Sequence, residues 1–206
     1  MNKDKTCILV GSSAFKEIIK VDKDDYLVAV DGGYDILSSF SLVPDLVIGD
    51  FDSAILKPAG KNVIEYPKEK DETDMMIAAK FCLQKGFNKF KIYGGLGGRL
   101  SHTLSNIILL TYLLDNNSEG ILYSDKETIQ LLKDGCLSFS AQEEGYISVF
   151  SLSKEAIGVT LSNLKYPLNN YDLKENDSIG QSNEFTGKEA KIEVKKGTLL
   201  IIKERK

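Results

Sequence analysis

Short apolar runs, each followed by a turn or by polar residues, recur through the first half of this 206-residue chain. Such runs are typical of strands that are buried on both faces of a sheet. The segments between them have helical character, so the sequence predicts a mostly parallel sheet with helices on both faces. The runs occupy residues 7–10, 26–30, 46–48, 63–64 and 90–93.

The clearest predicted helix spans residues 73–85, where apolar residues follow the i, i+3, i+4, i+7 spacing of one helical face. Thr73 is a suitable N-cap and Gly86 a suitable C-terminal stop. A second helix is expected from Arg99 to residue 114, and its segment 104–114 is so apolar that we expect burial on most sides. The apolar residues of the first helix are Met75, Ala78, Ala79 and Cys82.

The pattern changes after Ser124, where apolar and polar residues alternate at period two between regularly spaced glycines. This pattern predicts an antiparallel β-sandwich or barrel. We therefore expect an α/β domain over residues 1–124 and a β-sandwich over residues 125–206. The alternating sets are Leu137/Phe139, Ile147/Val149, Ile157/Val159/Leu161 and Ile192/Val194, and the glycines taken as turn signals include Gly135, Gly158 and Gly197.

Charge and cysteine content argue against several classes of protein. A formal net charge of −4 gives no broad basic surface, which disfavours nucleic-acid binding. No stretch approaches the roughly 20 apolar residues of a membrane helix. The three cysteines, Cys7, Cys82 and Cys136, form no C-x-x-C pair, which disfavours a disulfide framework or a zinc knuckle. We expect a cytoplasmic protein that binds neither nucleic acid nor membrane.

Two pairs of aspartates indicate a metal site. Asp50 and Asp52 follow a predicted strand and lie on one side of it if the extended backbone continues. Asp71 and Asp74 lie at the start of the first predicted helix. Magnesium is usually held by one or two carboxylates together with phosphates and water. The alternatives are a solvated turn for the first pair and a helix-dipole preference for the second.

A glycine-rich loop over residues 94–99 follows the last of the predicted parallel strands. It matches neither G-x-G-x-x-G, because residue 100 is leucine, nor a Walker A loop, because no G-K-[ST] follows. Its backbone N–H groups can approach phosphate closely, and Arg99 can donate to phosphate in a fork. The alternative is a plain strand-to-helix turn with a surface arginine.

Segments that follow predicted strands should meet at one edge of the sheet, because ligands bind beyond the carboxyl ends of parallel strands. Lys70 is either a phosphate contact or a solvated charge. His102, the single histidine, is expected to make a polar contact in the first turn of the second helix. The segments that follow strands are 11–12, 31–33, 49–52 and 94–98.

Taken together and in order, these motifs resemble the thiamine pyrophosphokinase family. They are Asp31-Gly32-Gly33, Gly49-Asp50-Phe51-Asp52-Ser53, Lys70-Asp71-Glu72-Thr73-Asp74 and Gly94-Gly95-Leu96-Gly97-Gly98-Arg99. The second half adds Asn163-Leu164-Lys165-Tyr166-Pro167-Leu168 and Ser182-Asn183-Glu184-Phe185. The resemblance covers most of the chain, and the combination is far more specific than any one motif.

The resemblance implies a homodimer with shared active sites, each subunit having an α/β nucleotide-binding domain and a C-terminal β-sandwich. It implies transfer of the pyrophosphoryl group of ATP to the hydroxyl of thiamine, with Mg²⁺ as cofactor and AMP as the second product. Magnesium and the triphosphate would be held by Asp50, Asp52, Asp71 and Asp74. The nucleotide-binding residues would be Asp31, Gly32, Gly33, Lys70, Gly94, Gly95, Gly97, Gly98, Arg99 and His102.

We expect catalytic roles for Asp71, Asp74 and Arg99. An aspartate near the hydroxyl can take its proton, and we assign this role to Asp71. The resemblance also implies that Tyr166 would stack on thiamine. Ser182 and Asn183 would contact its aminopyrimidine ring.

One position departs from the family pattern. The family usually has Gly-Gly-Arg-x-Asp-His, and this chain has Ser101 in place of the aspartate. Serine can donate a hydrogen bond but cannot supply the negative charge of an aspartate. Two alternatives therefore remain open, a pyrophosphokinase for a different alcohol and a non-catalytic sensor of thiamine or nucleotide.

Overall fold

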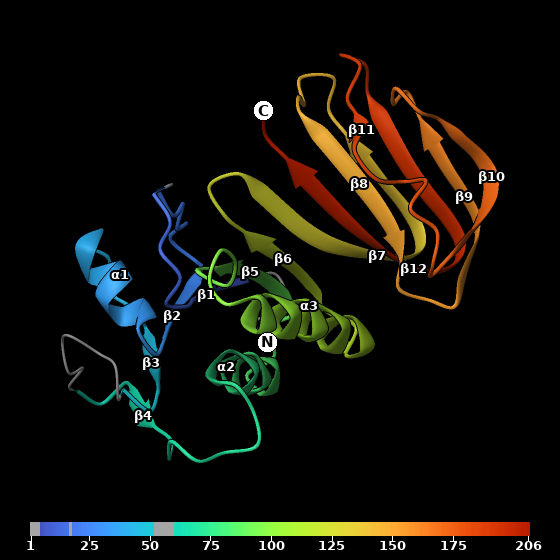
Figure 1. Ribbon diagram of the computed structural model, residues 1–206. Coiled ribbons are helices and arrows are strands. Elements are labelled where there is room, and N and C mark those ends of the chain that lie inside the picture. Colours follow the sequence, from blue (N-terminus) through green and yellow to red (C-terminus); the bar gives the residue numbers. More distant parts are fainter. Residues whose placement is uncertain (1–4, 17, 52–59) are drawn as a thin grey trace. The chain divides into compact units, whose positions relative to one another are not determined.

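The computed structural model describes residues 5–16, 18–51 and 60–206. It combines a mixed α/β arrangement with few helices, and it divides into two compact units, Met1–Asp125 and Lys126–Lys206 (Figure 1). The strands of the first unit lie in the order β6-β5-β1-β2-β3-β4, each parallel to its neighbours. Their bounds are β1 (Thr6–Val10), β2 (Tyr26–Val30), β3 (Leu46–Gly49), β4 (Val63–Glu65), β5 (Lys89–Tyr93) and β6 (Glu119–Tyr123). All five apolar runs are therefore strands.

The first unit contains α1 (Gly33–Ser39), α2 (Asp74–Gln84) and α3 (Leu100–Asp115). The prediction for α2 is confirmed: Thr73 caps it by accepting a hydrogen bond from the Met76 N–H, and its predicted apolar face is buried. Gly86 follows the helix with φ +89°, a conformation that glycine adopts without strain. No helix in the described part of the chain is both long and apolar enough to cross a membrane.

Helices α1 and α2 cover opposite faces of the sheet. Ile8 of β1 packs in one cluster with Leu37 of α1. Its strand neighbour Cys7 points the other way, and its thiol contacts that of Cys82 on α2. The start of α2 lies beside the carboxyl ends of the strands, because Asp74 lines one cleft with Gly11, Asp31 and Asp50.

The expectation that α3 is buried on most sides is wrong. Leu110 and Leu113 pack over Gly120 of β6, where glycine leaves room for both side chains. The opposite face of α3 stays open, with Leu104 57% and Ile108 53% exposed. An apolar composition alone did not reveal that only one face meets the sheet.

The second unit is built from antiparallel strand pairs. Residues Ala190–Glu204 form the long strand β12, which pairs with β7 on one side. On its other side, the first half of β12 pairs with β9 and the second half with β8. The remaining pairs are β10 with β9 and β11 with β8. The bounds are β7 (Glu127–Phe139), β8 (Tyr146–Ser151), β9 (Glu155–Ser162), β10 (Leu168–Lys174) and β11 (Asn183–Glu184).

Three glycines taken as turn signals, Gly135, Gly158 and Gly197, lie inside strands. Gly197 has φ +115° at an irregularity between β12 and β7, and its N–H donates to Asp134 Oδ1 at 2.7 Å. A bulge of this kind bends a strand. It coincides with the point at which β12 changes partner from β9 to β8.

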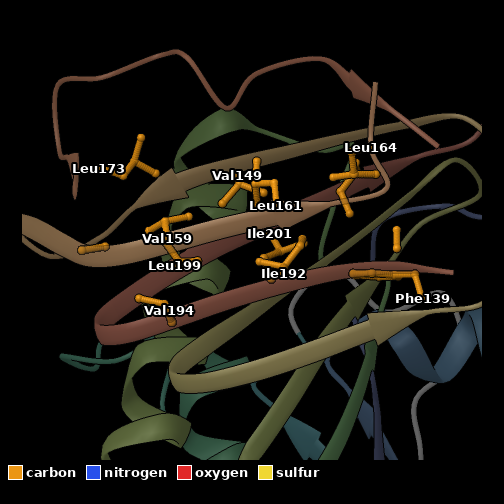
Figure 2. Packing of buried hydrophobic residues seen from close by; sticks show 13 residues of the cluster. Phe139, Val149, Val159, Leu161, Leu164, Leu173, Ile192, Val194, Leu199 and Ile201 are labelled. Atoms are coloured by element: carbon orange, nitrogen blue, oxygen red, sulfur yellow. The ribbon is translucent and has the colours of Figure 1, made fainter. Parts of the chain in front are cut away.

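The core of the second unit collects the apolar residues of the period-two pattern. Figure 2 shows Val149 of β8, Leu161 of β9, and Ile192 and Ile201 of β12 facing one another. All four are at most 1% exposed. Leu164 belongs to the same cluster and Phe185 packs against it, so the core also anchors the segments next to Tyr166 and Ser182.

Candidate active site

A cleft of about 590 Å³ lies where β1, β2, β3 and β5 end and where α2 and α3 begin. Asp31, Asp50, Asp74 and Arg99 line it together with Gly94. They come from segments far apart in sequence that parallel pairing brings to one edge. The site residues expected to meet there are thus largely brought together.

Lys70 lies between two of the predicted metal ligands. Its Nζ contacts Asp50 Oδ2 at 3.1 Å and Asp74 Oδ1 at 3.0 Å, and the three side chains are between 13% and 20% exposed. Burial lowers the pKa of Lys70, but hydrogen bonds and charges from Asp74 and Asp50 outweigh it and raise the pKa overall. Two carboxylate oxygens therefore converge on one cationic position.

This convergence fits a magnesium ion. Magnesium requires hard oxygen ligands and takes one or two carboxylates when substrate phosphates complete its shell. Within the described residues no group of three or more His, Cys, Asp or Glu side chains could hold a metal. The donor set thus suits an ion that arrives with phosphate.

The other two predicted metal ligands lie elsewhere or outside the described residues. Asp52 is outside them. Asp71 is exposed on a neighbouring groove beside Tyr66 and Lys80, and it is not part of the cleft lining. Asp71 precedes the N-cap of α2 in non-helical backbone, so the i, i+3 spacing from Asp74 does not place the two side chains together. The present geometry therefore does not support Asp71 as a proton acceptor in the cleft.

The floor of the cleft is formed by two backbone segments in close contact. Gly94 has φ +64°, and a Cβ there would lie 2.3 Å from the carbonyl oxygen of Gly11. The Ser13 N–H donates to the Gly94 carbonyl at 3.0 Å. The first glycine of the loop is thus required for packing, whereas Gly97 and Gly98 are exposed and outside the cleft lining.

The first turns of α3 supply Arg99, His102 and Asn106 to the cleft at i, i+3, i+7 spacing. Arg99 Nη2 donates to His102 Nε2, which leaves the ring proton on Nδ1. Buried Asn106 donates to the Gly95 carbonyl at 2.8 Å and ties the helix to the glycine loop. Sequence reasoning missed Asn106, although a polar residue at helical spacing from Arg99 was a usable signal. Ser101 is exposed and does not line the cleft.

In the Asp31-Gly32-Gly33 motif, the aspartate lines the cleft and the two glycines allow close packing. Asp31 lines the cleft at φ +49°, and its N–H donates to the Ile48 carbonyl at 2.7 Å. A Cβ on Gly33 would lie 1.8 Å from the Val10 oxygen, so glycine is needed for α1 to approach β1. Gly32 packs on Ser12 and is not part of the cleft lining.

The predicted thiamine residues lie close together in the second unit. Tyr166 is 55% exposed, with Lys165 Nζ 5.4 Å from its ring centroid. Asn183 is buried, and its side chain accepts a hydrogen bond from the Tyr166 N–H and donates one to the Tyr166 carbonyl. Ser182 is exposed at φ +52°, and its N–H donates to Ser148 Oγ at 3.0 Å.

Comparison with known proteins bears on both units. The family model described as "Thiamin pyrophosphokinase, catalytic domain" matches residues 19–122. The model described as "Thiamin pyrophosphokinase, vitamin B1 binding domain" matches residues 136–199. Together the matches take in the segment that carries Tyr166 and Asn183 and the cleft lining except Gly11, Ser12 and Ser13.

Individual relatives carry the same name. The chain is 30% identical over 189 residues to thiamine pyrophosphokinase of Bacillus subtilis (strain 168), covering 88% of each. It is 30% identical over 182 residues to thiamin pyrophosphokinase 1 of Caenorhabditis elegans, covering 80% of this chain and 73% of the relative. The crystal structure of the Bacillus subtilis enzyme matches with a TM-score of 0.86 at 28% identity, over 98% of this chain and 99% of that one. The chain belongs to the thiamine pyrophosphokinase family.

Proposed function

We propose that this protein transfers the pyrophosphoryl group of ATP to the hydroxyl of thiamine, giving thiamine diphosphate and AMP. The observation that carries the proposal is the convergence of Asp50 and Asp74 on one cationic position beside Arg99, in a chain of this family. The hydroxyl oxygen of thiamine attacks the β-phosphorus, and the bond to the α-phosphate oxygen breaks. Catalysis of this kind depends mainly on positioning and on charge neutralisation.

The N-terminal unit is the nucleotide site in this proposal. Arg99 donates to the phosphates, and the α3 N-terminus adds a positive electrostatic potential there. Asp31, Lys70, the Gly94-Gly95 turn and His102 line the space for the nucleotide. The backbone around this space is shaped by four glycines, which are Gly32, Gly33, Gly97 and Gly98.

Asp50 and Asp74 would hold Mg²⁺, with Asp52 and Asp71 as the further candidates from the family resemblance. The ion supplies charge neutralisation for the phosphates. Lys70 occupies the position between the two carboxylates. A metal ion held by Asp50 and Asp74 would displace the Lys70 ammonium, which could then contact phosphate.

The C-terminal unit, which we describe as a β-sandwich, is the thiamine site. Its exposed Tyr166 ring provides a stacking surface, and the neighbouring Ser182 hydroxyl is available to the aminopyrimidine. Asn183 is part of the same site because its side chain accepts a hydrogen bond from the Tyr166 N–H. The domain assignment is thus 1–124 for catalysis and 125–206 for thiamine recognition.

The test is AMP formation from ATP and MgCl₂ with and without thiamine. Asp50→Asn is expected to abolish thiamine-dependent AMP, because one of the two converging carboxylates is lost. Asp24→Asn is the control, since Asp24 is an exposed aspartate paired with Lys5 outside the cleft. ADP as product would refute attack at the β-phosphorus, and AMP formation with another alcohol instead of thiamine would favour the other-acceptor alternative.

The comparisons do not support the alternative of a non-catalytic sensor. That alternative started from Ser101, which does not line the cleft. Thiamine binding without turnover would revive it.

We also propose a cytoplasmic homodimer with shared active sites. An exposed apolar stripe on α3, formed by Leu100, Leu104 and Ile108 at i, i+4, i+8, supports a second copy as the partner. Light scattering measures the mass. Mixing inactive Asp50→Asn with inactive Tyr166→Ala restores activity if subunits share sites, and no recovery would argue for independent sites.

A further inference from the structure

We propose that Asn183 is a positioning residue: its side chain fixes the main chain of Tyr166 and does not itself contact thiamine. The inference rests on the proposed function, because it assigns a role within the thiamine site. It changes the role that the family resemblance suggested for Asn183, and it follows from the contacts of the side chain.

The carboxamide oxygen and one N–H of Asn183 are already hydrogen-bonded within the protein. The residue is 1% exposed, and Oδ1 accepts from the N–H of Tyr166 and from the N–H of Glu184, each at 2.9 Å. Nδ2 donates to the carbonyl of Tyr166 at 2.7 Å. A carboxamide oxygen has two lone pairs, so its acceptor capacity is used up. A contact between this oxygen and a ligand would break an existing hydrogen bond.

The main chain before Tyr166 is held by ordinary backbone pairing. Leu164 forms a bridge with Phe185, and the Lys165 N–H donates to the Glu184 carbonyl at 3.0 Å. One residue further on, the opposing backbone is that of Asn183, which belongs to β11 and pairs with Ile147 of β8. Among the backbone hydrogen bonds of the described residues, none joins Tyr166 to Asn183.

The Asn183 side chain makes this link in place of the backbone. It presents one acceptor and one donor to the N–H and carbonyl of the same residue, as a neighbouring strand would. Unpaired main-chain groups are costly when they are removed from water. Asparagine matches this requirement, because aspartate lacks the donor and alanine lacks both groups.

The result is a fixed loop with an exposed ring. The main chain of Tyr166 is held on both sides while its side chain stays 55% exposed. The adjoining Ser182 is anchored in the same way, by the bond from its N–H to buried Ser148. A surface that is ordered before the ligand arrives loses less entropy on binding.

The experiment is a double-mutant cycle on thiamine affinity, measured by calorimetry with Asn183→Ala, Tyr166→Ala and the double variant. We expect Asn183→Ala to weaken thiamine binding about tenfold, through loss of preorganisation. In the Tyr166→Ala background it should have almost no further effect, because Asn183 acts through Tyr166. Independent, multiplying losses would show that Asn183 contacts thiamine directly and would overturn the proposal. Asn169→Ala, an exposed asparagine on β10, is the matched control.

Amide hydrogen exchange gives a second readout that needs no ligand. The Tyr166 N–H should lose protection at least about tenfold in Asn183→Ala, while the Val149 N–H, bonded to the Gly180 carbonyl, keeps it. If the alanine variant does not fold, Asn183→Ser, which keeps one hydrogen-bonding group, takes its place. Unchanged Tyr166 protection would refute the positioning role. Failure of the wild type to bind thiamine would refute the proposed function instead.

Discussion

Replacing Lys70 by methionine removes the cation that lies between Asp50 and Asp74 and keeps a stem of similar length. The two carboxylates then face each other without the Lys70 ammonium between them. We expect the metal-free variant to be less stable than the wild type. We also expect Mg²⁺ to stabilise the variant more than it stabilises the wild type, because the ion no longer competes with the ammonium.

The magnitude follows from the distances. Both carboxylate oxygens contact one nitrogen, so they lie within about 6 Å of each other. Repulsion at that separation is about 0.7 kcal/mol at the dielectric constant of water and about 3 kcal/mol at an effective value of about 20. Side chains that are between 13% and 20% exposed fall between these limits. We expect a loss of about 1–3 kcal/mol, or a fall in Tm of about 3–9 °C.

The assay is thermal unfolding in EDTA and in MgCl₂ at matched ionic strength, without nucleotide. The pH should be near neutral, because the raised pKa of Lys70 gives stability that is present below its ordinary value of 10.5 and lost as pH rises through the folded value. Lys80→Met is the control, since Lys80 pairs with the single carboxylate of Glu72. If the two variants are equally stable in EDTA, or if Mg²⁺ shifts both equally, the reasoning is wrong.

Two further predictions concern the glycine loop and Glu184 of β11. Gly94→Ala puts a methyl group 2.3 Å from a backbone oxygen and should lower the free energy of unfolding in urea by about 2–4 kcal/mol. Gly97→Ala places its methyl group in open space and should lower it by about 1–2 kcal/mol. Equal losses would contradict the close packing at Gly94. Hydrogen bonds from Lys165 and Lys206 lower the pKa of Glu184 below its ordinary value of 4.5. The wild type should therefore be more stable than Glu184→Gln above pH 4.5, and this advantage should disappear as the pH falls through the pKa of Glu184 in the folded protein. A difference in Tm between wild type and Glu184→Gln that does not change with pH would contradict this prediction.

Local patterns were sufficient to predict the five apolar strands of the first unit and helix α2. The cap at Thr73 and the spacing of Met75 and Cys82 predicted α2, because capping and one-sided burial depend on residues within a few turns. The same reasoning failed for Gly197, whose place inside β12 depends on the distant Asp134. It also failed for the exposed face of α3, since composition does not say which side of a helix meets the sheet.

The sequence by itself determined the alternation of strands and helices, the change to period two, and the acidic, glycine-rich and aromatic motifs that identify the family. These are properties of neighbouring residues. The tertiary structure decided which motif residues meet: Lys70 between Asp50 and Asp74, Asp71 outside the cleft, and Asn183 turned onto the backbone of Tyr166. Such contacts depend on how distant segments approach one another, because a side chain binds what the fold places within reach.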